Sequence, residues 1–335
     1  MIFQDNFDLK ECIDFSNQGK NQIIFGLNQG EKSFFAGLYN KKTVIVASDF
    51  VAANAYKNQL NAMGKSAEII SVGIESPVFV YWQDLTQINA AIKNLTNFFY
   101  GNLDVLVLLP EALFLTLPNK ELFAPLKLEK GKNYNFSALA SELIKMGYTK
   151  QVIVSGEGEF AFRGDILDIF ITGHTKPIRV NFFDDEIEGL HTFALDDMSK
   201  LNDLESVEIN ANTIFFRENG DQIIQNLKAD FVEKKILTQR EEKFNQTLQN
   251  VIEAVETNPN NLNLAFTTVY DERFKHNILS FLTGEHFLFL DEPKKLLQTL
   301  DLVEINQNNS TLKLFEDGLL SQKHFKFYFD KTKLF

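Results

Sequence analysis

The sequence predicts an α/β protein in which a parallel sheet is interrupted by a strand-rich insertion. Apolar, strand-like runs alternate with helix-like stretches between residues 22 and 109. Short strands punctuated by glycines then fill residues 157–197, and strand-like segments with helix-like neighbours return after residue 262. Parallel strands need crossover helices and covered faces, so the first and third patterns are assigned to one α/β architecture. The middle pattern is assigned to a separate β-rich unit.

The first α/β part is predicted from its apolar periodicity. Asp104–Leu109 is apolar after its first residue, which favours a strand covered on both faces. Ser48 or Asp49 is a suitable N-cap for the helix that follows the strand Thr43–Ala47. The other expected elements are a helix within 1–20, a strand at Gln22–Phe25, a helix ending near Tyr39, a helix at Val51–Met63, a strand at Glu68–Ser71 and a helix at Gln87–Phe99.

The middle unit begins after a boundary at Pro118–Lys132, which is rich in Pro, Lys and Gly. A helix is expected at Ser137–Met146, ending at Gly147, and three or four short strands follow it. One of these strands has two distinct faces, because side chains alternate with a period of two. Ile178, Val180 and Phe182 share the apolar face, and Arg179, Asn181 and Phe183 share the other.

The remainder of the chain is predicted to return to α/β structure. Residues 220–256 are polar and favour helix, while Leu262–Thr268 and His286–Leu290 favour strands. Asn306–Ser310 has the composition of a linker, and Leu312–Phe335 favours short strands. A small C-terminal piece is therefore expected after the second α/β part.

Composition narrows the class of protein. The chain has 335 residues, with 33 Lys plus Arg against 45 Asp plus Glu, and a formal net charge of -12, which disfavours a general nucleic-acid binder. Cys12 is the single cysteine, so neither an internal disulfide nor a cysteine-based metal site is expected. The start lacks the basic region of a signal peptide, and no run of about 18 apolar residues predicts a membrane span. We therefore expect a cytoplasmic protein.

A phosphate-binding loop is suggested at Gly26–Ser33, which follows a predicted strand and opens a predicted helix. The loop pattern requires a glycine immediately before Lys32, but Glu31 occupies that position. A carboxylate there would face the β-phosphate, and its Cβ would crowd the converging backbone N–H groups. Lys32 and Ser33 remain, so we interpret the segment as a remnant of a nucleotide loop that binds no nucleotide.

Two acidic groups have a catalytic and a structural interpretation. Asp291 and Glu292 follow an apolar strand, where a nucleotide hydrolase holds Mg²⁺ and orients water. With the phosphate loop broken, a solvated corner at the end of the strand is favoured. The cluster Asp184–Glu188 falls where a hairpin should turn, so a solvated turn is favoured over a metal site or an acid–base pair. None of the five histidines is assigned a role.

Arg163, Arg179 and Phe183 leave two interpretations open. In the structural one, Arg179 pairs with a nearby acid and Phe183 completes a second small core. In the functional one, the arginines and the aromatic ring form a protein-binding surface, because these residue types anchor interfaces.

The amino-acid sequence of the middle unit resembles that of a known family. The runs GEFAFRGDILDIF and PIRVNFFDDEIEGLHTFALDD closely resemble the central segment shared by the excision-repair protein UvrB and the bacterial transcription-repair coupling factor, Mfd. UvrB keeps an intact phosphate loop, whereas Mfd carries a degenerate one near its N-terminus, as at Gly26–Ser33. The chain therefore looks like the N-terminal region of the Mfd family. The resemblance is strong over about residues 20–200 and weaker afterwards.

This resemblance implies a fold and partners. It implies a UvrB-like domain with a degenerate nucleotide-loop sheet, split around an inserted α+β domain. The implied limits are 1–122 and 210–298 for the split domain, 123–209 for the inserted domain and 299–335 for a small C-terminal domain. It also implies that the inserted domain binds the damage-recognition protein UvrA, through positions that match Arg163, Arg179 and Phe183.

The family also implies functions that lie outside this chain. The whole Mfd protein is an ATP-driven DNA translocase that acts on stalled RNA polymerase, and its motor, with ATP and Mg²⁺, is expected C-terminal to this chain. We therefore expect no hydrolytic activity and no cofactor in this part. A UvrB-like, nucleotide-dependent DNA-loading subunit is the alternative, and docking of the UvrA-binding face on the family's motor is a further expectation.

Overall fold

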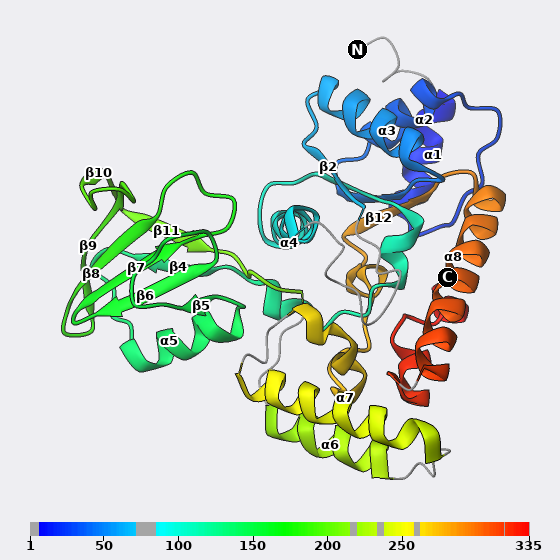
Figure 1. The fold of residues 1–335 in the computed structure, drawn as a ribbon. Helices are drawn as coiled ribbons and strands as arrows, with labels where there is room; N and C mark the ends of the chain where they lie inside the picture. The colour runs from blue at the N-terminus through cyan, green and yellow to red at the C-terminus, as the bar shows by residue number, and fades with distance from the viewer. Residues whose placement is uncertain are drawn as a thin grey trace.

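The computed structural model describes residues 7–71, 85–214, 220–232, 238–257, 262–317 and 319–334. Its first part is built on a four-stranded sheet in the order β12-β1-β3-β2, and every pairing in it is parallel. Three of these strands come from the first third of the chain, whereas β12 comes from residues beyond the insertion (Figure 1). The strands are β1 (Lys42–Val46), β2 (Ala67–Ile70), β3 (Val105–Leu108) and β12 (His286–Leu290).

Helices cover both faces of this sheet, as the apolar run of β3 predicts. Val105 and Val107 pack with residues of two of the helices that precede β3, and Leu106 and Leu108 face the opposite core. Period-two alternation therefore divides one continuous apolar strand between two cores. The helices of this part are α1 (Phe7–Asn17), α2 (Gln29–Gly37), α3 (Phe50–Ala62) and α4 (Leu85–Tyr100).

The inserted unit forms a separate lobe rich in strands (Figure 1). Its six-stranded sheet has the order β10-β9-β8-β7-β6-β5 and is antiparallel except between β5 and β6. Helix α5 (Phe136–Lys145) and the pair β4–β11 pack on one face of the sheet through Leu139, Leu143 and Leu128. The strands are β4 (Leu126–Glu129), β5 (Thr149–Lys150), β6 (Glu159–Arg163), β7 (Ile166–Phe170), β8 (Ile178–Phe183), β9 (Glu186–Phe193), β10 (Lys200–Leu204) and β11 (Ser206–Ile209).

A helical layer follows the insertion. Helices α6 (Gly220–Val232) and α7 (Thr238–Thr257) confirm the helical prediction for the described residues of 220–256. They share a core with the 3-10 helix Leu262–Tyr270 and the end of α8. A buried hydrogen bond from Tyr270 Oη to Asp230 Oδ2, 2.8 Å long, links this 3-10 helix to α6.

Helix α8 (Pro293–Glu316) includes residues that were predicted to form a linker and the first residues of a segment that was predicted to form strands. The predicted linker Asn306–Ser310 is wrong, because it lies inside α8, where Gln307 is 4% exposed. The predicted strands in Leu312–Phe335 are also wrong over the described residues, which form the end of α8 and two short 3-10 helices. Polar residues spaced at helical intervals among leucines complete a buried stripe, a pattern that composition alone does not reveal.

The chain after residue 298 packs onto the preceding cores. The predicted limit between 298 and 299 falls within α8. Leu300, Phe327 and Leu334 join the core on the α4 side of the parallel sheet, and Leu314 and Leu320 join the core of the helical layer. These contacts make the last residues an integral part of both cores.

Two predicted strands are wrong. Gln22–Phe25 is not paired in the described structure, and Ile23 and Phe25 are 79% and 84% exposed. Leu262–Thr268 belongs instead to the 3-10 helix that ends at Tyr270. Short apolar runs are compatible with several backbone conformations, and tertiary contacts choose among them. None of the described helices is long and apolar enough to cross a membrane.

Candidate functional site

The outer face of the inserted sheet gathers charges on three neighbouring strands. Asp168 on β7 lies directly opposite Arg179 on β8 and Ala161 on β6. Arg163 is two residues beyond Ala161, so its side chain emerges on the same face. The opposite face of these strands is the apolar core that contains Leu167. We call the outer-face group of Arg163, Asp168, Arg179 and Phe183 the arginine face.

Asp168 binds both arginines. Arg179 donates from Nε to Asp168 Oδ1 over 2.6 Å and from one terminal nitrogen to Oδ2 over 2.9 Å. Arg163 donates to Oδ2 over 2.6 Å. The Asp168 side chain is 2% exposed, compared with 16% for Arg179 and 42% for Arg163. Two guanidinium groups therefore share one buried carboxylate.

Arg179 is held on further sides. Its guanidinium carbon lies 4.8 Å from the centroid of the buried Phe193 ring, which favours a cation–π contact. One terminal nitrogen lies 3.9 Å from Met198 Sδ. The hydrogen bond to Asp168 raises the pKa of Arg179, although burial opposes this. The structural expectation that Arg179 pairs with a nearby acid is thus confirmed.

Phe183 occupies the end of β8 and is 70% exposed. The interpretation in which Phe183 completes a second small core is therefore wrong. Directly after it, Asp184 adopts a left-handed backbone conformation with φ of 52°, and the chain turns into β9. The predicted solvated turn is confirmed for Asp184 and Asp185, which form an exposed turn, whereas Glu186 and Glu188 are exposed residues of β9. The tight hairpin leaves the Phe183 ring projecting at the edge of the arginine face.

Sequence reasoning missed two members of this surface. Asp168 is the single carboxylate in the apolar run Ile166–Ile171, and a carboxylate in such a run requires a buried partner, which is the signal that could have found it. His191 lies opposite Arg179 on β9 and is 9% exposed. Burial lowers the pKa of His191, and the charges of Lys200 and Arg179 lower it further. Strand register brings these residues together, and no spacing in the sequence predicts it.

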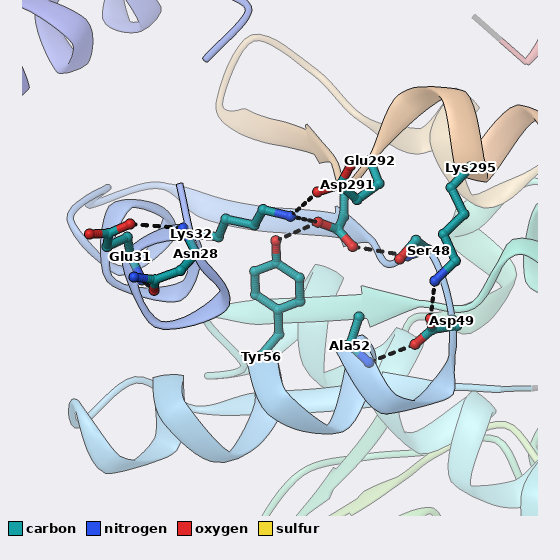
Figure 2. A network of polar contacts seen from close by, with 10 residues as sticks. All are labelled: Asn28, Glu31, Lys32, Ser48, Asp49, Ala52, Tyr56, Asp291, Glu292 and Lys295. Carbon is teal, nitrogen blue, oxygen red and sulfur yellow. Dashed lines mark hydrogen bonds and ion pairs between the residues drawn. The ribbon is translucent and has the colours of Figure 1, made fainter. Parts of the chain in front are cut away.

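The predicted remnant of a nucleotide loop is folded as a capped helix (Figure 2). Helix α2 begins at Gln29, within the stretch where a phosphate loop would be open. Asn28 Oδ1 accepts from the Glu31 N–H over 3.0 Å, and a Glu31 carboxylate oxygen accepts from the Asn28 N–H over 2.8 Å. This capping box occupies backbone donors that a phosphate would need. Gly26 lies before the helix with φ of 83°.

The two predicted remnants meet in three dimensions. Lys32 Nζ lies 2.9 Å from Asp291 Oδ1 and 2.5 Å from Glu292 Oε1 (Figure 2). Tyr56 Oη donates to Asp291 Oδ1 over 3.2 Å, and the Ser48 N–H donates to Oδ2 over 3.3 Å. We call Lys32, Asp291 and Glu292 the lysine corner. The expectation of a solvated corner is wrong for Asp291, which is 5% exposed.

The lysine corner pairs one ammonium with two carboxylates, which leaves it a formal charge of -1. Burial opposes the charge on Lys32, but the hydrogen bonds to Glu292 and Asp291 outweigh it and raise the pKa of Lys32. The ammonium and the two carboxylates therefore satisfy one another. Ser33 is buried at 0% exposure, on the inner side of the same helix. The arrangement is well suited to joining α2 to the end of β12.

The comparisons with known proteins follow this division of the molecule. Residues 126–215 match the family described as UvrB interaction domain. That span begins at β4 and covers the whole sheet that carries the arginine face. The β-rich lobe is thus the part of the chain that is similar to this family.

Proteins described as transcription-repair-coupling factor are similar to stretches of the chain that differ in length. The Bacillus subtilis protein is 23% identical over 98% of this chain, and the chain spans 29% of its length. The Borreliella burgdorferi protein is 30% identical over 57% of this chain and 18% of its own length. The Escherichia coli protein is 37% identical over 25% of this chain. The resemblance to the N-terminal region of the transcription-repair coupling factor is confirmed.

Proposed function

We propose that this chain is the repair-recruiting module of a transcription-repair coupling factor and that its arginine face binds UvrA. One observation carries the proposal. Phe183 projects at 70% exposure on the same sheet face as two arginines, within the residues that match the UvrB interaction domain. A large exposed aromatic and guanidinium groups on one face combine the two residue types that anchor protein interfaces.

The chemistry of the face indicates what its partner presents. Two arginines and one aspartate give the group a net charge of +1 on a chain whose formal net charge is -12. An acidic partner group would meet Arg163, whose side chain is 42% exposed, and an apolar pocket would receive the Phe183 ring. This pattern favours a protein partner over a small molecule.

The α/β part acts in this proposal as a UvrB-like split scaffold that presents the inserted domain. The lysine corner serves as an ion-pair clasp between α2 and β12, and this chain hydrolyses no nucleotide. Support comes from the capping box at Asn28 and Glu31 and from the carboxylates around Lys32. RNA polymerase, DNA, ATP and Mg²⁺ would engage the whole coupling factor outside these residues.

A pull-down with purified UvrA tests the proposal. The variant Arg179→Ala, Phe183→Ala is expected to lose UvrA, with a decrease in affinity of more than about tenfold. Val152→Ala is the matched control, because Val152 is also a large exposed apolar residue of the same domain, at 83% exposure. Retention of UvrA by the double variant, with an unchanged circular dichroism spectrum, would refute the assignment of this face.

A further inference from the structure

We propose that Asp168 is a positioning residue that holds the arginines of the arginine face in the geometry a partner's carboxylate recognises. This inference rests on the proposed function of that face. It adds a residue that would touch no partner: the Asp168 side chain is 2% exposed and lies beneath two guanidinium groups. Its effect on binding would pass through Arg163 and Arg179.

The Asp168 carboxylate accepts hydrogen bonds from both arginines. Asp168 Oδ1 accepts from Arg179 Nε, and Oδ2 accepts from a terminal nitrogen of each arginine. A buried carboxylate is tolerated when its lone pairs are satisfied in this way. Because the aspartate sits on the central of three strands, it fixes the spacing of two side chains that enter from β6 and β8.

The two arginines differ in how far their side chains are exposed. Arg179 is surrounded by Asp168, the Phe193 ring and Met198, and only 16% of its side chain is exposed. Arg163 has one hydrogen bond to Asp168 and a side chain that is 42% exposed, so it is more accessible to a partner than Arg179. A guanidinium that is tethered at one nitrogen has already lost much of its rotamer freedom, so binding loses less entropy.

Positioning by Asp168 and simple charge attraction predict different effects of neutralising Asp168 on binding. Neutralising Asp168 would raise the net charge of the arginine face from +1 to +2. If long-range attraction alone determined binding to an acidic partner surface, this change would tighten the complex. If the geometry of the guanidinium groups determines binding, the same change would weaken it. The two mechanisms therefore predict opposite signs for one substitution.

The experiment is a calorimetric titration of the full chain with purified UvrA. Asp168→Asn is expected to weaken binding by about tenfold, because the amide no longer fixes both forks. Asp203→Asn is the matched control: Asp203 lies on the same sheet face, opposite His191, with a side chain that is 74% exposed. It removes the same charge and is expected to leave binding unchanged or slightly tighter. Binding by Asp168→Asn as tight as by the wild type would overturn the inference.

Two further measurements keep the result interpretable. The ¹⁵N–¹H signal of the Arg179 Nε group, which donates to Asp168 Oδ1, is expected to lose its protection from solvent exchange in Asp168→Asn, while thermal melting verifies the fold. If that variant fails to fold, Arg163→Lys replaces it, because this change keeps the charge and removes the planar fork. Wild-type binding by Arg163→Lys would then overturn the inference.

The outcomes also separate this inference from the proposed function. If Arg179→Ala, Phe183→Ala retains UvrA, the arginine face is not the binding surface and both proposals fall. If that double variant loses UvrA while Asp168→Asn and Arg163→Lys bind normally, the proposed function stands and only the positioning role is wrong.

Discussion

Lys32 Nζ lies 2.9 Å from Asp291 Oδ1, although the two residues are 259 positions apart in the chain. Lys32 belongs to the first turns of α2, and Asp291 follows β12, the strand that returns to the parallel sheet after the insertion. The ion pair therefore joins the beginning of the α/β part to its last strand. It adds to the parallel pairing of β12 with β1 in closing the interrupted sheet.

Lys32→Met should destabilise the protein. The substitution leaves Asp291, whose side chain is 1% exposed, without its ammonium partner. Removing one partner of a buried pair costs about 1–3 kcal/mol at a partly exposed position such as this. Urea unfolding measures the change, and Lys295→Met, which breaks an exposed pair with Asp49, is the control expected to change little. Equal stability of the two variants would contradict the proposal that Lys32 stabilises the fold by joining α2 to the end of β12.

Glu31→Gly should not create a nucleotide site, even though it supplies the glycine that the loop pattern requires. Helix α2 already begins at Gln29, and Lys32 remains bound by Asp291 and Glu292. Loss of the capping box and a glycine inside the helix should lower stability by about 1–2 kcal/mol. Isothermal titration with Mg·ATP is expected to give no heat of binding, and micromolar affinity would contradict the prediction.

Asp49 should contribute mainly as a helix cap. Its carboxylate accepts from the Ala52 N–H over 2.8 Å at the start of α3, and it also pairs with Lys295. Asp49→Ala removes the cap and should cost about 1 kcal/mol in urea unfolding. Asp49→Asn keeps an acceptor for the cap but loses the ion pair, so it should remain close to the wild type. A large loss in the asparagine variant would instead assign the stability to the pair.

His191 should make the inserted domain sensitive to acid. Burial, with Lys200 and Arg179, lowers the pKa of His191 below its ordinary 6.5, while Asp203 and Asp168 oppose that change. Below pH 6.5 the unfolded chain takes up the proton before the folded one, so stability falls as pH falls toward the folded pKa. His191→Gln should lose this part of the pH dependence. Urea unfolding at about pH 7.5 and about pH 5.5 measures it.

The direct check is the titration of His191 by NMR, with its signal assigned from the His191→Gln spectrum. A midpoint at or above 6.5 would contradict the lowered pKa.

Much of the fold follows from local pattern. The buried runs of β1 and β3, the apolar strand β12, a helix cap at Ser48 or Asp49 and the two faces of β8 were predicted, and all are present, with Asp49 as the cap. These features depend on periodicity or on a hydrogen bond within one turn, and such information is contained in neighbouring residues. The predicted strands at Gln22–Phe25 and Leu262–Thr268 are wrong, because a short apolar run becomes a strand only where a sheet offers it a partner.

The candidate site likewise contains residues that the sequence singled out and residues that only the structure revealed. Arg163, Arg179 and Phe183 were singled out by residue type and alternation, and the structure gives them unequal exposure. Asp168 could not be assigned from the sequence, because its two partners lie on different strands and reach it only through register. The same holds for His191, which lies opposite Arg179 across a hairpin that contains a bulge.

By itself, the sequence determined the α/β class, the strand-rich insertion, the face of β8 that carries Arg179 and Phe183, and the presence of Glu31 where a nucleotide loop requires glycine. The tertiary structure decided which charges meet: Asp168 beneath two arginines, and Lys32 between Asp291 and Glu292. The physical reason is the distance along the chain over which each interaction acts. Periodicity and capping act over one or two turns, whereas ion pairs between distant strands depend on sheet register and burial, which exist only once the chain has folded.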